Sequence, residues 1–349
     1  MRKKEFGSEF HFCDKDFILK KQEKVFFDDK NFSCFLSGRS SLYALLKQGI
    51  KELGWKKVYV PSYYCQDVIE NLPELGIEVI IFHFNPQKTL LDIDFFEDDK
   101  SSVFINVNYF GIVMPNIGLF KNMTIVDDLT HDLLSIKESS SDYVFASLRK
   151  QLPIPLGGVL YSPKKYKLPT GIESVKGDET AEYKTLGMFL KREYLENRFH
   201  NKDFFRNYYV KAEKQLTSLY KDFALPVLVK NISDGLAVER IIKKKESNIK
   251  LCSKQLKDFN DFLISSNEKA LGILLLFNSS SERDFIRNKL IEVNVYPAIL
   301  WPNQKTELDI NYQNRFLFLH VDFRYSKEDI IYITTALKKS IQECQKQKL

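Results

Sequence analysis

The sequence predicts an α/β protein built on a mostly parallel sheet that helices cover on both faces. In the first half of the 349-residue chain, short apolar runs alternate with segments that carry apolar residues at helical spacing. The apolar runs contain few polar residues, as is typical of strands that are buried on both sides. Together these observations favour parallel strands joined by helical crossovers.

A first helix is predicted over residues 40–53, where leucine and isoleucine recur three and four residues apart. The strand at 56–60 is expected to stop at Pro61, because proline cannot donate a hydrogen bond to a sheet. A second helix is predicted over residues 66–72. The remaining strands of this half are predicted at 78–82, 103–106, 124–127, 143–147 and 158–161.

The second half begins with a helical, charged and aromatic stretch, residues 183–223, without a predicted strand. After Pro226 the predicted elements are helix 234–263, strand 271–277, helix 281–292, strand 295–296, strand 315–319, and a helix that starts at a capping box in 326–329 and ends near 338. We therefore expect a large domain over 1–223, with 183–223 as a helical connector. A small αβ domain over 224–349 is expected to pack closely against it.

Composition excludes several classes of protein. With 44% hydrophobic and 28% charged residues, the chain is neither disordered nor collagen-like. The net charge of +6 is spread along the chain, and its tightest basic cluster, 243–245, is predicted to be a solvated helix face, so no nucleic-acid partner is expected. The longest apolar run, 270–277, is far shorter than the ~20 residues of a membrane helix. Without the apolar core of a signal peptide, the chain is expected to be cytoplasmic, with no membrane partner.

Common catalytic motifs are absent. The five cysteines are scattered and share no CxxC spacing, so neither a disulfide framework nor a metal site is expected. The sequence also lacks the P-loop, the dinucleotide-binding glycine fingerprint, the GxSxG elbow and the HExxH motif.

Two candidate segments consist of small or aromatic residues, one at the start of a predicted helix and one after a predicted strand. The run Ser37-Gly38-Arg39-Ser40-Ser41 opens a predicted helix, whose first backbone N–H groups and dipole favour an anion such as a phosphate. The alternative is a simple serine N-cap. Tyr63 and Tyr64 directly follow a strand, where their rings could stack on a planar ligand, although such rings more often pack in the core.

Two further candidates are polar. Asp127 and Asp128 end a strand, with His131 close behind, at the edge where α/β sheets bind ligands. The alternative is a capping aspartate and a surface histidine. Lys150 follows another strand, where a desolvated amine could act as a nucleophile, and Gly157 and Gly158 would let two backbones pass closely. The alternative there is a solvated lysine at the mouth of a loop.

In order and spacing, these segments resemble the pyridoxal-phosphate enzymes of fold type I (the aspartate-aminotransferase fold), and most closely the DegT/DnrJ/StrS family of sugar aminotransferases. The family's SGTxAL turn is matched by residues 37–42, its VPSFTF segment by 60–65, its VHLYG segment by 107–111, its EDAAH strand end by 127–131, and its lysine segment by 147–150 running on to Gly157 and Gly158. The similarity covers roughly residues 35–161 well, and the C-terminal part only by pattern.

The chain also departs from the family pattern. Cys65 stands where the family has its ring-stacking aromatic residue, so Tyr63 or Tyr64 would have to take that role. Arg39 replaces a threonine, Asn108 replaces a histidine, and the serine precedes the lysine by three residues rather than five. These changes leave the lysine and the aspartate in place and bear on the substrate.

The resemblance implies a role for each matched residue. Lys150 would hold pyridoxal phosphate covalently and move protons, Asp128 would face the pyridine nitrogen, and His131 would lie near the phenolic oxygen. The phosphate would be held by Gly38, Arg39, Ser40 and Ser147. Arg324, which follows a strand of the small domain, would pair with the carboxylate of the amino donor, unless it is a surface arginine beside the Ser326 cap. Trp301 and Pro302 would line the same mouth or pack there.

The function implied is a homodimeric aminotransferase that moves an amino group from glutamate to a keto-sugar nucleotide, in surface-polysaccharide or related sugar biosynthesis. A second hypothesis keeps the cofactor but assigns aldolase, dehydratase or other lyase chemistry on another amino compound. Lys150 argues against the dehydratase variant of the family, which replaces that lysine. A third hypothesis is a non-catalytic binding protein on the same fold.

Overall fold

The computed structural model describes residues 4–12, 14–20, 23–84, 86, 91–118, 120–259, 267 and 269–347. Its helices are α1 (Gly38–Leu53), α2 (Gln66–Ile69), α3 (Val175–Leu195), α4 (Lys202–Ser218), α5 (Val227–Asp234), α6 (Val238–Gln255), α7 (Ser280–Glu292), α8 (Glu307–Arg315) and α9 (Lys327–Gln347). Its strands are β1 (Phe32–Phe35), β2 (Lys57–Pro61), β3 (Glu78–Phe82), β4 (Ser102–Val107), β5 (Thr124–Asp128), β6 (Tyr143–Ser147), β7 (Gly158–Tyr161), β8 (Ile273–Leu276) and β9 (Phe316–Leu319).

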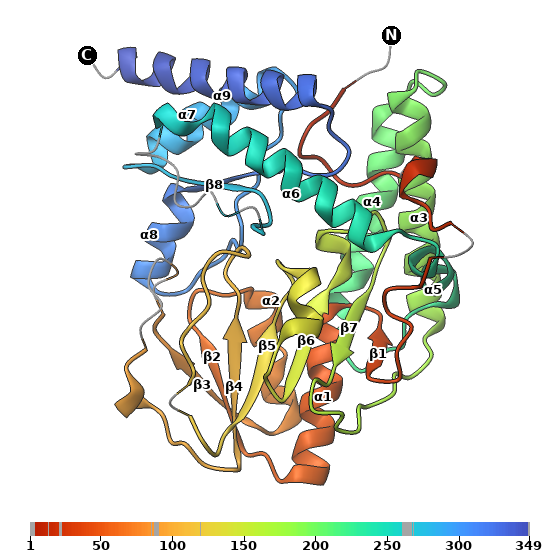
Figure 1. Ribbon diagram of the computed structural model, residues 1–349, viewed down its shortest axis with the longest axis vertical. Coiled ribbons are helices and arrows are strands. Elements are labelled where there is room, and N and C mark those ends of the chain that lie inside the picture. Colours follow the sequence, from red (N-terminus) through yellow and green to blue (C-terminus); the bar gives the residue numbers. More distant parts are fainter. Residues whose placement is uncertain are drawn as a thin grey trace.

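A seven-stranded sheet forms the lower half of the molecule in Figure 1, with the strand order β1-β7-β6-β5-β4-β2-β3. β7 is antiparallel to both of its neighbours, and the other pairs are parallel. The carboxyl ends of β2, β4, β5 and β6 therefore meet at one edge, which faces the second, smaller sheet. This confirms the predicted fold class, a mostly parallel sheet in an α/β protein.

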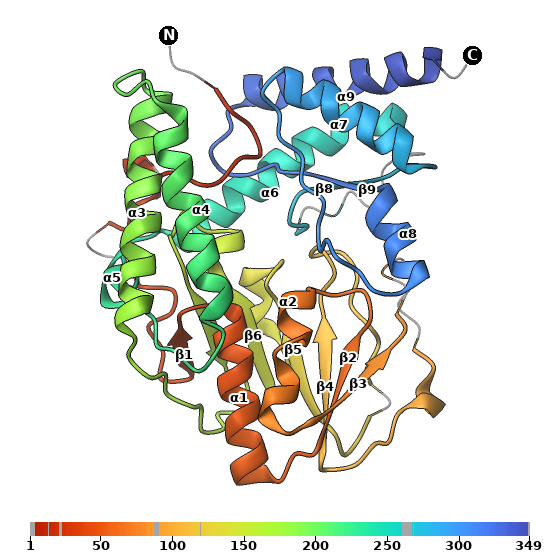
Figure 2. The same ribbon diagram turned by 180° about the vertical axis from the view of Figure 1, so that it is seen from behind.

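Helices and loops bury both faces of this sheet. Every residue of β4 is buried. On one face lie α1 and α2, which are in front of the sheet in Figure 2. On the other face, Val144 and Ala146 of β6 pack in one cluster with Leu133, Ile136 and Ile241. The continuous burial explains why these strands have no alternation of polar and apolar residues.

Most predicted strands have the observed bounds to within one residue, whereas several other predictions were wrong. β1 and α8 were not predicted; β1 is only four residues long and contains a serine and a cysteine. The helix predicted over 234–263 is α6, which begins only at Val238 and ends at Gln255, and α5, which ends at Asp234, was not predicted. Residues 260–263 lie outside the described residues. The helical stretch predicted over 183–223 is the hairpin of α3 and α4, which already begins at Val175.

The smaller sheet is the antiparallel pair β8 and β9, with Ile273 opposite Leu319. α6, α7 and α9 pack around it in the upper half of Figure 1. The strand predicted at 295–296 is an isolated bridge between Val295 and Phe6, so the N-terminal segment joins this core. The domain boundary near Phe223 stays a prediction.

The last helix, α9, begins at the predicted capping box. The backbone N–H of Asp329 donates to Ser326 Oγ at 3.2 Å, and the backbone N–H of Ser326 donates to Asp329 Oδ2 at 2.9 Å. Each side chain thus satisfies a backbone donor that the helix leaves unpaired. The helix ends at Gln347, beyond the predicted end near 338.

Aromatic residues connect the two sheets. Trp301 and Phe316, from the C-terminal part, belong to the same buried cluster as Tyr63 and Tyr109, which follow β2 and β4 of the large sheet. The ring centroids of Tyr63 and Phe316 are 5.9 Å apart. Within the described residues, no helix is long and apolar enough to cross a membrane.

Candidate active site

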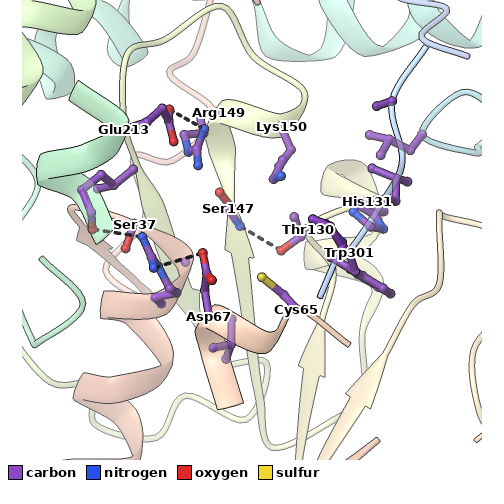
Figure 3. Close-up of a pocket in the computed structure, with 18 of the residues that line it drawn as sticks. Ser37, Cys65, Asp67, Thr130, His131, Ser147, Arg149, Lys150, Glu213 and Trp301 are labelled. Carbon is purple, nitrogen blue, oxygen red and sulfur yellow. Dashed lines mark hydrogen bonds and ion pairs between the residues drawn. The ribbon is translucent and has the colours of Figure 1, made fainter. Parts of the chain in front are cut away.

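A cavity of about 450 Å³ lies at the edge where the parallel strands end, between the two sheets. The loops after β1, β2, β5 and β6 contribute to its walls, together with α4, the N-terminal segment and the chain before and after β9. Figure 3 shows Lys150, Ser147, Cys65 and Thr130 around its centre, with Trp301 on one side and Arg149 on the other. The strand order of the sheet brings together four chain segments that are up to 113 residues apart (150 − 37), from Ser37 to Lys150.

One end of the cavity is formed by the start of α1. The Ser37 hydroxyl caps this helix by accepting the backbone N–H of Ser40 at 3.1 Å. Gly38 lies directly against the end of β6, since a Cβ added there would be 3.1 Å from the backbone nitrogen of Ser147. The helix N-terminus and the Ser147 side chain therefore face the same space, which is the arrangement expected of an anion site.

The close backbone approach predicted at the glycine pair is confirmed. A Cβ on Gly158 would lie 2.1 Å from both the carbonyl carbon and the oxygen of Ser37. Gly157 has a φ of 131°, which side chains rarely tolerate. These two glycines let β7 pass directly behind the start of α1.

Asp128 ends β5 with a buried carboxylate. Its Oδ1 accepts the backbone N–H of Thr130 at 2.9 Å, and its Oδ2 accepts the hydroxyl of Tyr64. Burial raises the pKa of Asp128, and hydrogen bonds from the Thr130 side chain, the Tyr64 hydroxyl and the Thr130 backbone act against that rise. Asp127, its neighbour, points away from the cavity and bonds to Asn106 and Ser139.

His131 is held as a neutral ring. Burial, and then the charges of Lys150 and Lys245, lower its pKa to about 3. Its Nδ1 accepts the backbone N–H of Phe110 at 3.1 Å, so the proton of the neutral ring is on Nε2. The ring lies nearly parallel to that of Trp301, with centroids 5.4 Å apart.

Lys150 follows β6 in a short 3-10 turn, Leu148–Lys150, and its side chain is open to the cavity (Figure 3). The Lys150 side chain is solvent-exposed at the cavity. The surrounding protein displaces part of its water, which lowers the pKa of the amine, and the nearby charge of Arg149 lowers it further. Among the described residues, no acceptor binds the Nζ of Lys150. The amine is therefore free to react with a ligand in the cavity.

Two arginines line the side of the cavity next to α4. Arg39 Nη2 donates to the carbonyl of Leu216 at 3.0 Å, and its Nη1, 3.6 Å from Asp67, is buried without a hydrogen bond. Arg149 Nη1 is 3.0 Å from Glu213 Oε1. Burial alone would raise the pKa of Glu213, but Arg149 and the paired Lys184 lower it to about 2. Sequence reasoning missed Arg149 and Glu213. The position of Arg149 beside Lys150 could have identified it.

The structure brings together most of the predicted site residues. Those that line the cavity are Gly38, Arg39, Tyr64, Asp128, His131, Ser147, Lys150 and Arg324. Ser40 is buried beneath the turn, where its hydroxyl contacts that of Ser37 at 3.0 Å. Tyr63 does not line the cavity; it is fully buried in the aromatic core, so we do not carry it into the site.

The guanidinium of Arg324 is already engaged. It forms two bonds to the Asp322 carboxylate, Nε to Oδ1 at 3.0 Å and Nη2 to Oδ2 at 2.8 Å. It also donates to the backbone carbonyls of Ser8 and Glu9 at 3.0 and 3.2 Å. The predicted pairing with a donor carboxylate would require an exchange of these bonds, and that role stays a prediction.

This architecture is the fold of pyridoxal-phosphate-dependent enzymes of fold type I, as comparison with solved structures shows. The chain is similar to Spr1654 of Streptococcus pneumoniae, assigned as a sugar aminotransferase and solved in its PLP form. The TM-score is 0.60 and the identity 13%, over 94% of this chain and 93% of that one.

Two other solved structures share the fold. NtdA from Bacillus subtilis, with the cofactor PMP bound, has a TM-score of 0.58 at 14% identity, over 89% of this chain and 73% of that one. Serine palmitoyltransferase from Sphingomonas wittichii has a TM-score of 0.56 at 12% identity, over 92% and 74%. No model of a known protein family and no curated protein sequence matches this chain.

Proposed function

We propose that the protein is a pyridoxal-phosphate-dependent aminotransferase. The observation that carries the proposal is the meeting of three groups in one cavity of this fold. They are the unpaired Lys150 amine, the buried Asp128 carboxylate, and the start of α1 beside Ser147. Lys150 would bind the aldehyde carbon of the cofactor, Asp128 its pyridine nitrogen, and the start of α1 its phosphate.

The residues present fit this cofactor. At the phosphate end, the missing Cβ of Gly38 leaves room beside Ser147, whose hydroxyl has no partner among the residues that the structure describes. Arg39 Nη1 is buried there without a hydrogen bond, and a phosphate oxygen would be a suitable acceptor. Asp128 offers an acceptor that favours a protonated pyridine nitrogen. When bound, the cofactor supplies an electron sink for the bonds at the substrate α carbon.

The chain's own groups would handle the protons. Lys150, with its lowered pKa, would take the proton from the substrate α carbon and return it as general base and then general acid. Neutral His131 would offer its Nε2–H as a hydrogen-bond donor inside the cavity. The rings of Phe110 and Trp301 beside it would exclude water from this side.

For substrates, we propose glutamate as amino donor and a keto-sugar nucleotide as acceptor. The proposal is supported by the resemblance to sugar aminotransferases in roughly residues 35–161 and by the arginines at the cavity wall, which suit anionic groups. A homodimer in the cytoplasm belongs to the same proposal, because enzymes of this fold share their active sites across a dimer.

The test is the visible absorbance of the purified protein with pyridoxal phosphate, before and after addition of glutamate. We expect a band from bound cofactor that glutamate bleaches, with one 2-oxoglutarate formed per site. Lys150→Ala is expected to lack the normal band. Lys176→Ala, which removes an exposed lysine on α3, is the matched control and is expected to behave as wild type.

Each other result has a definite meaning. Absence of the band in the wild-type protein would contradict the proposed cofactor and favour a binding protein on this fold. A band that glutamate leaves unchanged, but that another amino compound alters without forming a keto acid, would replace transamination by lyase chemistry.

A further inference from the structure

The surroundings of Asp128 are apolar along the sheet. In the strand register, Asp128 is opposite Val107 of β4 on one side and Phe145 of β6 on the other. The residue is 5% exposed. A carboxylate taken out of water in this way is unfavourable unless hydrogen bonds replace its hydration.

Hydrogen bonds replace that hydration at both oxygens. The backbone N–H of Thr130 binds Oδ1 and the Tyr64 hydroxyl binds Oδ2. The backbone bond is fixed by the turn after β5, and the Thr130 side chain in the same turn also hydrogen-bonds this carboxylate. Tyr64 is the donor that reaches Asp128 from another segment of the chain. Its own ring is 1% exposed and meets Trp301 edge-on, with centroids 5.4 Å apart, which fixes the direction of the hydroxyl.

We propose that Tyr64 is a positioning residue for the cofactor site: its hydroxyl keeps the Asp128 carboxylate ionised and oriented toward the bound pyridine nitrogen. This inference rests on the proposed function. It assigns Tyr64 a different role from the ring stacking that the sequence suggested, since the phenol acts through Asp128 and its ring packs against Trp301.

Other titratable groups surround the same carboxylate. Asp127 lies beside it on β5 and Tyr109 follows β4, while His131 and Lys150 line the cavity. Neither Asp127 nor Tyr109 donates a hydrogen bond to Asp128, because Asp127 bonds to Asn106 and Ser139, and Tyr109 donates to the carbonyl of Tyr63. Loss of the Tyr64 hydroxyl would therefore remove the hydrogen bond that it donates to Oδ2, and the pKa of Asp128 would rise further.

The test is the affinity of Tyr64→Phe for pyridoxal phosphate, measured by absorbance titration from about pH 5.5 to 8.5. Affinity is expected to fall about tenfold or more at the acid end, as for a lost hydrogen bond to a charged group. The deficit should shrink as the pH rises, because Asp128 then ionises in the variant as well.

Unfolding of the cofactor-free protein gives a second readout with the opposite slope. The hydroxyl stabilises only the ionised carboxylate, so the stability deficit of Tyr64→Phe should widen as the pH rises through the same range. Tyr59→Phe is the matched control, because it also removes a buried hydroxyl. This hydroxyl accepts the Glu97 backbone N–H at a distance of 3.0 Å and does not line the cavity. Tyr59→Phe should change neither the pH dependence of cofactor affinity nor the pH dependence of stability. In an Asp128→Asn background, Tyr64→Phe should have no pH-dependent effect.

Equal deficits at every pH, in either measurement, would overturn the inference and make Tyr64 a packing residue. This failure is distinct from failure of the proposed function, in which the wild-type protein itself shows no cofactor band. In that case the unfolding slopes still decide whether Tyr64 keeps Asp128 ionised.

Discussion

The imidazole of His131 is buried against the indole of Trp301, and its Nδ1 accepts the backbone N–H of Phe110. A protonated ring would lose that hydrogen bond and place a charge among aromatic side chains near Lys150. Burial is the largest reason why the pKa of His131 falls to about 3. At neutral pH the residue therefore acts as a fixed donor through Nε2 and does not carry a positive charge.

This neutral state predicts a pH dependence of stability. In the unfolded chain a histidine takes up its proton near pH 6.5, whereas folded His131 does so only near pH 3. The free energy of unfolding should therefore fall as the pH drops below about 6.5, by up to about 1.4 kcal/mol per pH unit for this one proton. Urea denaturation between about pH 7 and 5 measures it. His131→Gln should show a shallower slope, and equal slopes would show that His131 is not buried as a neutral ring.

At this scale, sequence reasoning predicted the residues whose role depends on order along the chain. Lys150 and Asp128 stand at strand ends, and parallel strand ends meet at one edge, so their meeting could be expected. The contact between Tyr64 and Asp128 could not, because it depends on the direction of one hydroxyl across the sheet. The bonds of Arg324 to the N-terminal segment were equally beyond reach, since 315 residues separate Arg324 from Glu9.

At the scale of elements, the crossing of α1 and β7 fixes the candidate phosphate end. The parallel bridge between Ser37 and Gly157 brings the two elements into direct contact. The sequence predicted the glycine pair. It also predicted the flanking strands β6 and β7, because their apolar runs are short and well bounded. β1 was not, since a four-residue strand carries too little pattern to separate it from a loop.

Gly158→Ala should disturb this crossing. Its new Cβ would lie 2.1 Å from backbone atoms of Ser37, which cannot turn away as a side chain could. We expect a loss of stability of about 3 kcal/mol, with cofactor affinity falling as the start of α1 moves away from Ser147. Gly235→Ala is the control, because a Cβ there meets ordinary contacts of 3.5 Å. If Gly158→Ala binds the cofactor as wild type does, the α1 end is not the phosphate site.

At the scale of the whole molecule, the N-terminal segment lies across the cavity and is held by the C-terminal half. Gly7, Ser8, Glu9 and Phe10 line the cavity, and Arg324 binds two carbonyls of this stretch. Phe6 fills a place in the core around the small sheet. Sequence patterns describe local structure, so they predicted both sheets but not this segment, whose position depends on contacts with distant residues.

Arg324→Gln should release this arrangement. Burial would raise the pKa of Asp322, yet Arg324 holds that pKa below its usual value. Both side chains are buried, with 9% of Arg324 and 8% of Asp322 exposed. Removing the arginine leaves a buried carboxylate unpaired, and we expect a loss of roughly 3–5 kcal/mol in unfolding free energy. The double variant with Asp322→Asn should recover much of it. If Arg324→Gln keeps wild-type stability and loses only affinity for the amino donor, Arg324 is the carboxylate-binding residue instead.

The aromatic cluster that joins the two sheets opposes rotation of one sheet against the other. Rigid rotation of the small sheet would have to pull Phe316 and Trp301 out of contact with Tyr63. It would also break the backbone bond from the Leu271 N–H to the carbonyl of Phe110, which measures 2.8 Å. Such a rotation would therefore cost buried aromatic contacts as well as a backbone hydrogen bond.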